Sequence, residues 1–332
     1  MDPEQVKLLF VVNIPEFFLS HRLPVAMAAR DAGYDVHIAT GPGDASARIT
    51  ELGFTHHKVP LTRSGQNPLG ELRFMWSLRG LFKKVKPDIV HFVTIKPVLY
   101  GGIMARLLGV PAMVAAITGL GTIFLSPNTG HAMVRRCVTS LYRVALGHKN
   151  IKILCQNPDD LGMVLRLGSV RKEQTELIRG SGVALDHYTV RPEPMGLPVV
   201  TFAARLLRDK GVLEYIEAIR LLKRQGVKAQ FWLVGSPDPE NITSVSEKHI
   251  QAWSAEGLVE NFGFREDIAE IFAQSNIVVL PSYREGLPKV LIEAAACGRA
   301  VITTDVPGCR DAIEPGKSES PRIWRRLQFL RE

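Results

Sequence analysis

The sequence has little cysteine, with only four such residues among 332. They show no spacing typical of metal or redox sites, and each lies in or near an apolar segment: Cys137, Cys155, Cys297 and Cys309. We therefore expect buried, reduced thiols, as in a cytosolic protein, and we expect no bound metal.

We also expect no targeting segment and no membrane span. The N-terminus, MDPEQVK followed by LLFVVNI, carries no basic leader, and its apolar run is too short for a secretory signal. The uncharged stretch 107–130 is long enough to suggest a transmembrane helix, but glycine and proline interrupt it at six positions. The pattern favours a buried strand followed by a glycine-rich loop.

The chain has no cluster of positive charge of the kind that forms a nucleic-acid-binding arm, although its net charge is +8. Dispersed basic residues without an aromatic recognition motif make nucleic acid an unexpected partner. The charge fits an acidic substrate and an anionic membrane surface equally well. A length of 332 residues, with 46% hydrophobic and 22% charged residues, predicts a globular protein of roughly two domains.

Short apolar runs alternate with helical patterns in the first half of the chain. We expect strands at Lys7–Asn13, Asp35–Ala39, Ile89–Phe92, Ala112–Thr118 and Ile151–Cys155. We expect helices at Leu19–Ala32, Ala45–Leu52, Leu69–Lys84, Pro97–Leu108, Ala132–Leu146 and Pro158–Leu167. This order predicts a parallel sheet covered by helices on both faces.

The alternation stops in a Gly- and Pro-rich stretch at 180–198 and then starts again. Strands are expected at Val199–Ala204, Ala229–Val234, Ile277–Leu280 and Ala300–Thr303, with helices at 209–225, Ile268–Gln274 and Pro288–Cys297. The fold class is therefore α/β, with two doubly wound, Rossmann-like domains, and ligands are expected at the carboxyl ends of strands. The boundaries are 1–182 for the first domain, 183–198 for a linker, 199–316 for the second domain and 317–332 for a basic tail.

Two features at strand ends in the second domain suggest a ligand site. Arg205 and Lys210 leave a strand and flank the start of a helix, an arrangement suited to a diphosphate, although two surface cations explain it as well. Gly235 follows the next strand and would let a ligand approach the backbone, which an ordinary turn also explains.

The most informative segment runs from Pro281 to Gly298. Glu285 stands in a loop before Gly286, and Glu293 follows within an apolar helical pattern. Because charged groups are seldom buried without partners, Glu293 indicates a pair of ligand hydroxyls such as those of a ribose. A partly exposed helical glutamate is the alternative.

These features resemble the retaining glycosyltransferases of the GT-B fold, family 4. The resemblance covers residues 6–316 and is carried by Arg205 with Lys210, by the segment SYREGLPKVLIE at 282–293 and by TTDVPGC at 303–309. It implies two Rossmann-like domains that face each other across a cleft, and transfer of a sugar from a nucleotide diphosphate with retained anomeric configuration.

The resemblance also implies roles for the matching residues. Arg205 and Lys210 would hold the donor diphosphate and stabilise the leaving group, and together with Glu285 they would form the catalytic set. Glu285 would contact the donor sugar, Glu293 the ribose, and the backbone at Gly235, Gly286 and Leu287 would add contacts. No cofactor or metal is implied, and the chain has no Asp-x-Asp triplet, which fits charge stabilisation by cations and helix dipoles. The donor is expected to be a nucleotide-diphosphate sugar, with a UDP-sugar favoured.

The first domain would bind the acceptor. Segments there resemble the subgroup that extends polyprenyl-diphosphate-linked sugars, and the candidate contacts lie at strand ends: Ser20, His21, Arg22, Thr94, Lys96, Thr118 and Gly119. Each of these residues alone also fits a structural role. The implied partners are a nucleotide-sugar donor and a lipid-linked glycan acceptor, for an enzyme in the cytoplasm or in peripheral contact with the inner face of the plasma membrane.

Two further segments leave alternatives open. Apolar residues between Phe74 and Phe82, interleaved with basic ones, predict either a core helix with a solvated basic edge or a membrane-facing helix. Beyond Gly316 the tail fits neither the strand nor the long final helix of the family, so we expect a truncated second domain. A shortened, inactive nucleotide-sugar-binding remnant and a nucleotide-sugar epimerase are the alternative functions.

Overall fold

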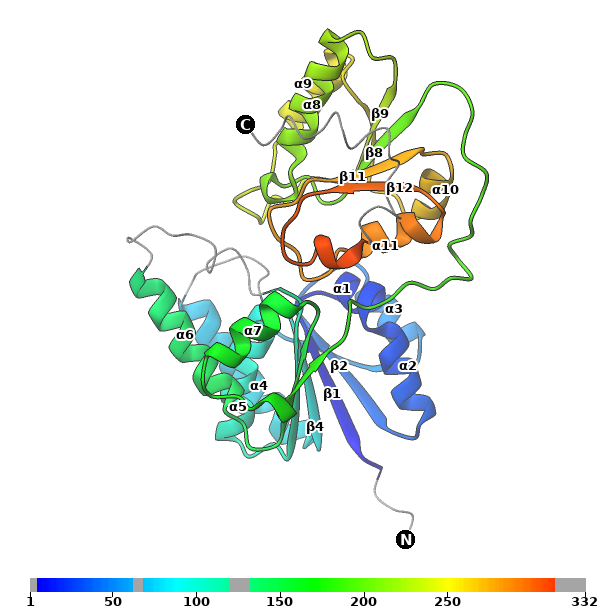
Figure 1. Cartoon of the computed structure of the whole chain (residues 1–332). Helices are drawn as coiled ribbons and strands as arrows, with labels where there is room; N and C mark the ends of the chain where they lie inside the picture. Colours follow the sequence, from blue (N-terminus) through cyan, green and yellow to red (C-terminus); the bar gives the residue numbers. More distant parts are fainter. Residues whose placement is uncertain (1–4, 62–67, 120–131, 314–332) are drawn as a thin grey trace. The chain divides into compact units, whose positions relative to one another are not determined.

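The computed structural model describes residues 5–61, 68–119 and 132–313 (Figure 1). The chain divides into two compact units, Met1–Ser181 and Gly182–Glu332. Both are built from parallel strands alternating with helices. The tail at 317–332, and with it the expected truncation, lies outside the described residues.

Unit 1 contains a seven-stranded sheet in the order β3-β2-β1-β4-β5-β6-β7, with every neighbouring pair parallel. Its strands are β1 (Lys7–Val12), β2 (Asp35–Thr40), β3 (Thr55–Lys58), β4 (Ile89–Val93), β5 (Ala112–Ile117), β6 (Ile151–Cys155) and β7 (Thr175–Leu177). Along β1, Leu9 and Val11 pack into one hydrophobic cluster, while Phe10 and Val12 pack into the other. A strand buried on both faces explains why the sequence is apolar without interruption there.

Helices cover both faces of this sheet. They are α1 (Pro15–His21), α2 (Leu23–Asp31), α3 (Ser46–Glu51), α4 (Pro68–Val85), α5 (Gly102–Leu107), α6 (Ala132–Leu146) and α7 (Pro158–Arg166), with a π-helical turn at Pro97–Gly101 and a 3-10 turn at Lys172–Gln174. The expected single helix at 19–32 is wrong, because α1 ends at His21 and α2 begins at Leu23. Pro24 lacks the N–H that a continuous helix would need.

Helix α4 resolves one alternative left open by the sequence. Phe74, Leu78, Leu81 and Phe82 are buried in the unit 1 core, whereas Trp76 is exposed and lies beneath the Arg79 guanidinium, 5.2 Å from its ring centroid. The helix therefore contributes to the core and keeps a basic outer edge. In the described ranges, no helix is both long and apolar enough to cross a membrane.

Unit 2 contains a five-stranded parallel sheet in the order β10-β9-β8-β11-β12. Its strands are β8 (Val199–Ala203), β9 (Gln230–Val234), β10 (Glu260–Gly263), β11 (Ile277–Leu280) and β12 (Ala300–Thr303). Its helices are α8 (Val212–Arg224), α9 (Glu247–Ala255), α10 (Ile268–Ala273) and α11 (Lys289–Ala296), with 3-10 turns at Arg208–Lys210 and Arg310–Ala312. Helix α9 was not predicted from the sequence. The edge strands β3, β7 and β10 were also not predicted, because they are short and largely polar.

The segment expected to link the domains packs on unit 2. Arg299 donates from Nη2 to the carbonyl of Arg191 at 2.6 Å, and Arg191 forms a bidentate pair with Glu270. Val190 lies against Gly298, where an added Cβ would meet its Cγ1 at 2.9 Å. The backbone of this segment is therefore held in place by the second sheet and its helices.

The cysteines whose side chains are described behave as expected. Cys155, Cys297 and Cys309 are free and buried. Burial raises the pKa of Cys155 to about 12 and that of Cys309 to about 11, so both remain protonated thiols at neutral pH. The side chain of Cys137 lies outside the described set.

Candidate functional site

The sheet of unit 2 reverses its winding between β8 and β11, which are neighbours in space but not in sequence. In an open parallel sheet the loops after two such strands diverge to opposite faces and leave a crevice for ligands. Arg205 and Lys210 follow β8, while Ser282 and Glu285 follow β11. The fold therefore brings two of the predicted clusters to one edge.

The two loops are joined by hydrogen bonds. The carbonyl of Asp209 accepts from Ser282 Oγ and from the Tyr283 amide, each at 3.0 Å. Lys210 Nζ lies 2.5 Å from Glu285 Oε1, and Ser282 Oγ lies 2.8 Å from the same oxygen, which is a second acceptor for its single hydroxyl proton. The Lys210 and Glu285 side chains are 21% and 12% exposed, so this pair is largely shielded but still reaches solvent.

Two glycines permit the close approach of these loops. Gly211, between Lys210 and α8, has φ +78°, and an added Cβ would lie 2.1 Å from the carbonyl oxygen of Pro281. Gly308, with φ +81°, would place a Cβ 2.5 Å from the carbonyl oxygen of Glu285. Only glycine combines a left-handed backbone with so short a distance.

Arg205 has a partner that the sequence analysis missed. Its Nη1 donates to Asp238 Oδ2 at 2.7 Å, and the Asp238 carboxylate is buried whereas the guanidinium is half-exposed. The sequence gives no sign of this ion pair, because Asp238 lies 33 positions after Arg205 and follows a different strand, β9. The exposed side of the guanidinium remains accessible to an anionic ligand.

Glu293 is buried on α11 with two partners from the protein itself. Tyr188 donates its hydroxyl to Glu293 Oε1 at 2.6 Å, and Lys289 Nζ lies 3.1 Å from the same oxygen. Burial, followed by the hydrogen bond to Glu293, raises the pKa of Tyr188, which therefore stays protonated and remains a donor. Burial of Glu293 thus has an internal explanation, and its contact with a ribose stays a prediction.

The remaining predicted donor residues are placed near this edge. Gly235 directly follows β9 with φ +131°, and an added Cβ would lie 1.9 Å from the Ala204 carbonyl oxygen, so packing against the neighbouring strand already requires glycine there. Gly286 is buried and Leu287 partly buried between Glu285 and α11. We expected Pro288 inside the helix, but in the structure it is the N-cap residue of α11.

In unit 1 the equivalent reversal lies between β1 and β4. The carboxyl ends of these strands lead to α1 and to the turn around Thr94. Ser20 donates to the Glu16 carbonyl at 2.7 Å and lies 2.7 Å from His21 Nδ1, while the imidazole of His21 stacks on Phe17 with ring centroids 4.1 Å apart. Both side chains therefore have structural contacts within α1.

Arg22 and His91 are buried polar side chains at this edge. In the described structure, Arg22 Nε and His91 Nε2 have no hydrogen-bond partner. Burial lowers the pKa of His91 to about 3, with a smaller effect from Arg22, and burial lowers the pKa of Arg22 to about 10. His91 stacks on Phe10 at 4.9 Å and is neutral at physiological pH. Buried donors without partners are uncommon and mark a place where a ligand could bind.

The other predicted acceptor residues lie at the ends of β4 and β5. Thr94 has φ +75°, unusual for a β-branched residue, and its buried Oγ1 lacks a partner within the described structure. Lys96 is paired with Glu71 of α4, with Nζ 2.6 Å from Oε1. Thr118 and Gly119 follow β5 and are partly buried, whereas the glycine-rich loop expected next lies outside the described residues.

Comparison with known proteins identifies the family. A model described as "Glycosyl transferases group 1" matches residues 197–323, and one described as "Glycosyl transferase 4-like" matches residues 7–157. The chain belongs to the family 4 glycosyltransferases. The two matched regions fall in the two structural units, and the enzyme class predicted from the sequence is confirmed.

Individual relatives of this transferase agree with that assignment. It is 28% identical over 89% of its length to the N,N'-diacetylbacillosaminyl-diphospho-undecaprenol alpha-1,3-N-acetylgalactosaminyltransferase of Campylobacter jejuni, covering 82% of that protein. It is 26% identical over 75% of its length to the UDP-Gal:alpha-D-GlcNAc-diphosphoundecaprenol alpha-1,3-galactosyltransferase of Escherichia coli, covering 66% of that protein.

A solved structure confirms the fold class. HepE of Anabaena in complex with UDP-glucose superposes with a TM-score of 0.71 at 19% identity, covering 99% of this chain and 90% of that one. The transferase therefore has the GT-B fold with two Rossmann-like units. The roles of individual site residues stay predictions.

Within the described ranges, no group of three or more His, Cys, Asp or Glu side chains is placed to hold a metal ion. At the edge of the unit 2 sheet, Arg205 and Lys210 pair with carboxylates. At the edge of the unit 1 sheet, Arg22, His91 and Thr94 each have a polar atom without a partner in the described structure. This donor set suits hydroxyl- and phosphate-bearing ligands.

Proposed function

We propose that this transferase moves a hexose or N-acetylhexosamine-type sugar from a nucleotide-diphosphate donor, with a UDP-sugar favoured, to a lipid-linked glycan acceptor. The reaction would retain the anomeric configuration and serve polysaccharide or glycan assembly at the cytoplasmic face of the membrane. The observation that carries the proposal is the meeting of Lys210 and Glu285 at the reversal point of the second sheet. The names of two relatives specify undecaprenyl-diphosphate-linked substrates and favour this acceptor class.

Arg205 and Lys210 would bind the donor diphosphate. Both cations already have a carboxylate partner, Asp238 and Glu285 respectively. The carboxylates hold the cations in place before the donor arrives, so little side-chain reorganisation is needed for binding. A phosphate would accept from the exposed part of Arg205 and share Lys210 with Glu285, which would then be placed beside the sugar.

The transfer step needs no protein nucleophile in this proposal. The acceptor hydroxyl would attack the anomeric carbon on the face that the diphosphate leaves, forming the new C–O bond as the bond to the phosphate oxygen breaks. The hydroxyl proton would pass to the leaving phosphate oxygen. Arg205 and Lys210 would stabilise the negative charge that develops there.

In unit 1 the acceptor would meet the edge formed by Arg22, His91 and Thr94. Each of these side chains has a buried polar atom without a partner in the described structure, so a ligand oxygen would satisfy it. Because His91 is neutral, it offers either a donor or an acceptor to a sugar hydroxyl. His21 and Lys96 would lie beside this group along the chain.

Calorimetric titration of the purified chain with UDP, GDP and their sugar conjugates, without metal, tests the donor site. We expect saturable binding that Arg205→Ala weakens and that Arg224→Ala leaves unchanged, because Arg224 is exposed at the far end of α8. A charge-assisted contact to phosphate is worth about 1.5–3 kcal/mol, or roughly ten- to a hundredfold in affinity. No binding by the folded chain would contradict the proposal.

Transfer is tested by adding a polyprenyl-diphosphate-linked sugar to the bound donor. Formation of an extended, alpha-linked product supports the proposal. Conversion of the donor sugar to its epimer without acceptor would instead support the epimerase alternative.

A further inference from the structure

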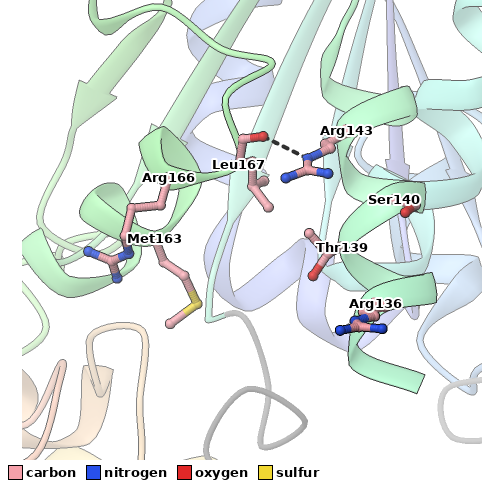
Figure 2. Close-up of a pocket in the computed structure, with 7 residues that line it drawn as sticks. All are labelled: Arg136, Thr139, Ser140, Arg143, Met163, Arg166 and Leu167. Carbon is pink, nitrogen blue, oxygen red and sulfur yellow. Dashed lines mark hydrogen bonds between the residues drawn. The ribbon is translucent and has the colours of Figure 1, made fainter. Parts of the chain in front are cut away.

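Unit 1 contains a cleft that belongs to neither predicted site. It lies between α6 and the C-terminal end of α7 and has a volume of about 520 Å³ (Figure 2). From α6 it is lined by side chains that recur at helical spacing, Arg136, Thr139, Ser140 and Arg143. None of its lining residues is among the predicted donor or acceptor contacts.

The cleft carries an unbalanced positive charge. Arg136, Arg143 and Arg166 line it, and no aspartate or glutamate does. Among the described residues, none of the three forms an ion pair, in contrast to Arg220 and Arg265, which have carboxylate partners. Arg136 and Arg143 stand on α6 and Arg166 stands on α7, so the cleft has positive charge on both sides and would attract an anion.

One guanidinium is fixed across the cleft. Arg143 donates from Nε to the backbone carbonyl of Leu167 at 2.8 Å, which joins α6 to the end of α7 (Figure 2). Its two terminal nitrogens then point into the space between the helices, as Figure 2 shows. A guanidinium held in this way loses little freedom when it binds a tetrahedral oxyanion with two parallel hydrogen bonds.

The other lining groups complement this cation. Thr139 and Ser140 add two hydroxyls on the α6 side, and Met163 and Leu167 add an apolar wall on the α7 side. Hydroxyls donate readily to phosphate oxygens, and the apolar wall suits a carbon substituent next to the phosphate. We propose that the cleft between α6 and α7 is a binding site for a phosphate-bearing ligand.

Such a phosphate has two sources, a soluble phosphate or diphosphate compound and the headgroup of an anionic phospholipid. Both offer the same oxyanion to the arginines. They differ in whether binding requires a bilayer, and that difference can be measured. Attraction between exposed charges falls with ionic strength, so binding from either source should weaken as salt increases.

The first arm of the test is calorimetric titration of the full chain with inorganic diphosphate. We compare wild type with Arg136→Gln/Arg166→Gln and with the control Lys149→Gln/Lys172→Gln, which removes equal charge from exposed residues of the same unit outside the cleft. Arg136 and Arg166 are exposed, so their substitution should not affect folding, which thermal unfolding verifies. We expect the arginine variant to lose one binding event per chain, or at least about tenfold in affinity, while the control keeps it.

The second arm measures sedimentation with phosphatidylglycerol vesicles and with phosphatidylcholine vesicles. Loss of phosphatidylglycerol binding in the arginine variant alone identifies the lipid headgroup as the source, and diphosphate binding without any vesicle effect identifies a soluble compound. Arg136→Lys/Arg166→Lys keeps the charge but removes the forked geometry, and we expect weakened binding. The proposal is overturned if Arg136→Gln/Arg166→Gln and the control Lys149→Gln/Lys172→Gln are indistinguishable in both arms.

Discussion

Replacing Gly211 by alanine tests the packing that joins the two loops of the donor site. Gly211 has φ +78° and ψ 25°, and an added Cβ would lie 2.1 Å from the carbonyl oxygen of Pro281. The left-handed backbone costs an alanine about 1–2 kcal/mol. Overpacking against a fixed backbone atom adds about 1–3 kcal/mol, so the variant should lose about 2–5 kcal/mol in the free energy of unfolding of unit 2.

Gly226→Ala is a matched control in the same unit. Gly226 has φ +73° after the end of α8, and an added Cβ would meet nothing within 4 Å. This variant should therefore show the backbone cost alone, about 1–2 kcal/mol. The difference between the two variants measures the contact between the loops.

Urea denaturation followed by tryptophan fluorescence is a suitable assay, because Trp232 and Trp253 are both buried in unit 2. Gly211→Ala should also weaken UDP binding, since the displaced loop after β11 carries Ser282 and Glu285. Equal midpoints for Gly211→Ala and Gly226→Ala would refute the close packing of these loops and the site geometry derived from it.

Three further outcomes are expected. Glu293→Ala should weaken donor binding about tenfold, whereas Glu285→Ala should reduce turnover more than binding; equal, negligible effects in titration and transfer assays would argue against both roles. His91 has a pKa of about 3 in the folded chain and about 6.5 when unfolded, so the unfolded state binds more protons and stability falls as the pH drops from 6.5 towards 3. His91→Phe should reduce this slope by up to about one proton, measured by circular dichroism in urea at pH 7 and pH 4.5. Tyr215→Phe should destabilise unit 2 by about 1–2 kcal/mol, because its buried hydroxyl donates its one proton to the Val200 carbonyl at 2.7 Å, with the Trp232 carbonyl at 3.1 Å; an unchanged urea midpoint would mean that water replaces the hydroxyl.

The sequence was sufficient for the class of fold because buried parallel strands produce apolar runs that are easy to detect. LLFVV in β1 is apolar since its side chains enter the cores on both faces of the sheet. The polar strand THHK at the sheet edge lacks this signal, so β3 was missed. The local break between α1 and α2 was missed for a different reason, because the apolar periodicity continues through Pro24.

The sequence by itself also determined which residue types stand at the strand ends, including Arg205, Lys210 and Glu285. Only the tertiary structure decided which of them meet. Lys210 and Glu285 are 75 positions apart and come together because β8 and β11 are neighbours in the sheet. The sequence does not show that Asp238 meets Arg205 or that Tyr188 meets Glu293, because the proximity of these segments depends on the order of strands and helices in space. The helical spacing of the cleft residues on α6 can be read from the sequence, but it does not show that α7 lies opposite them.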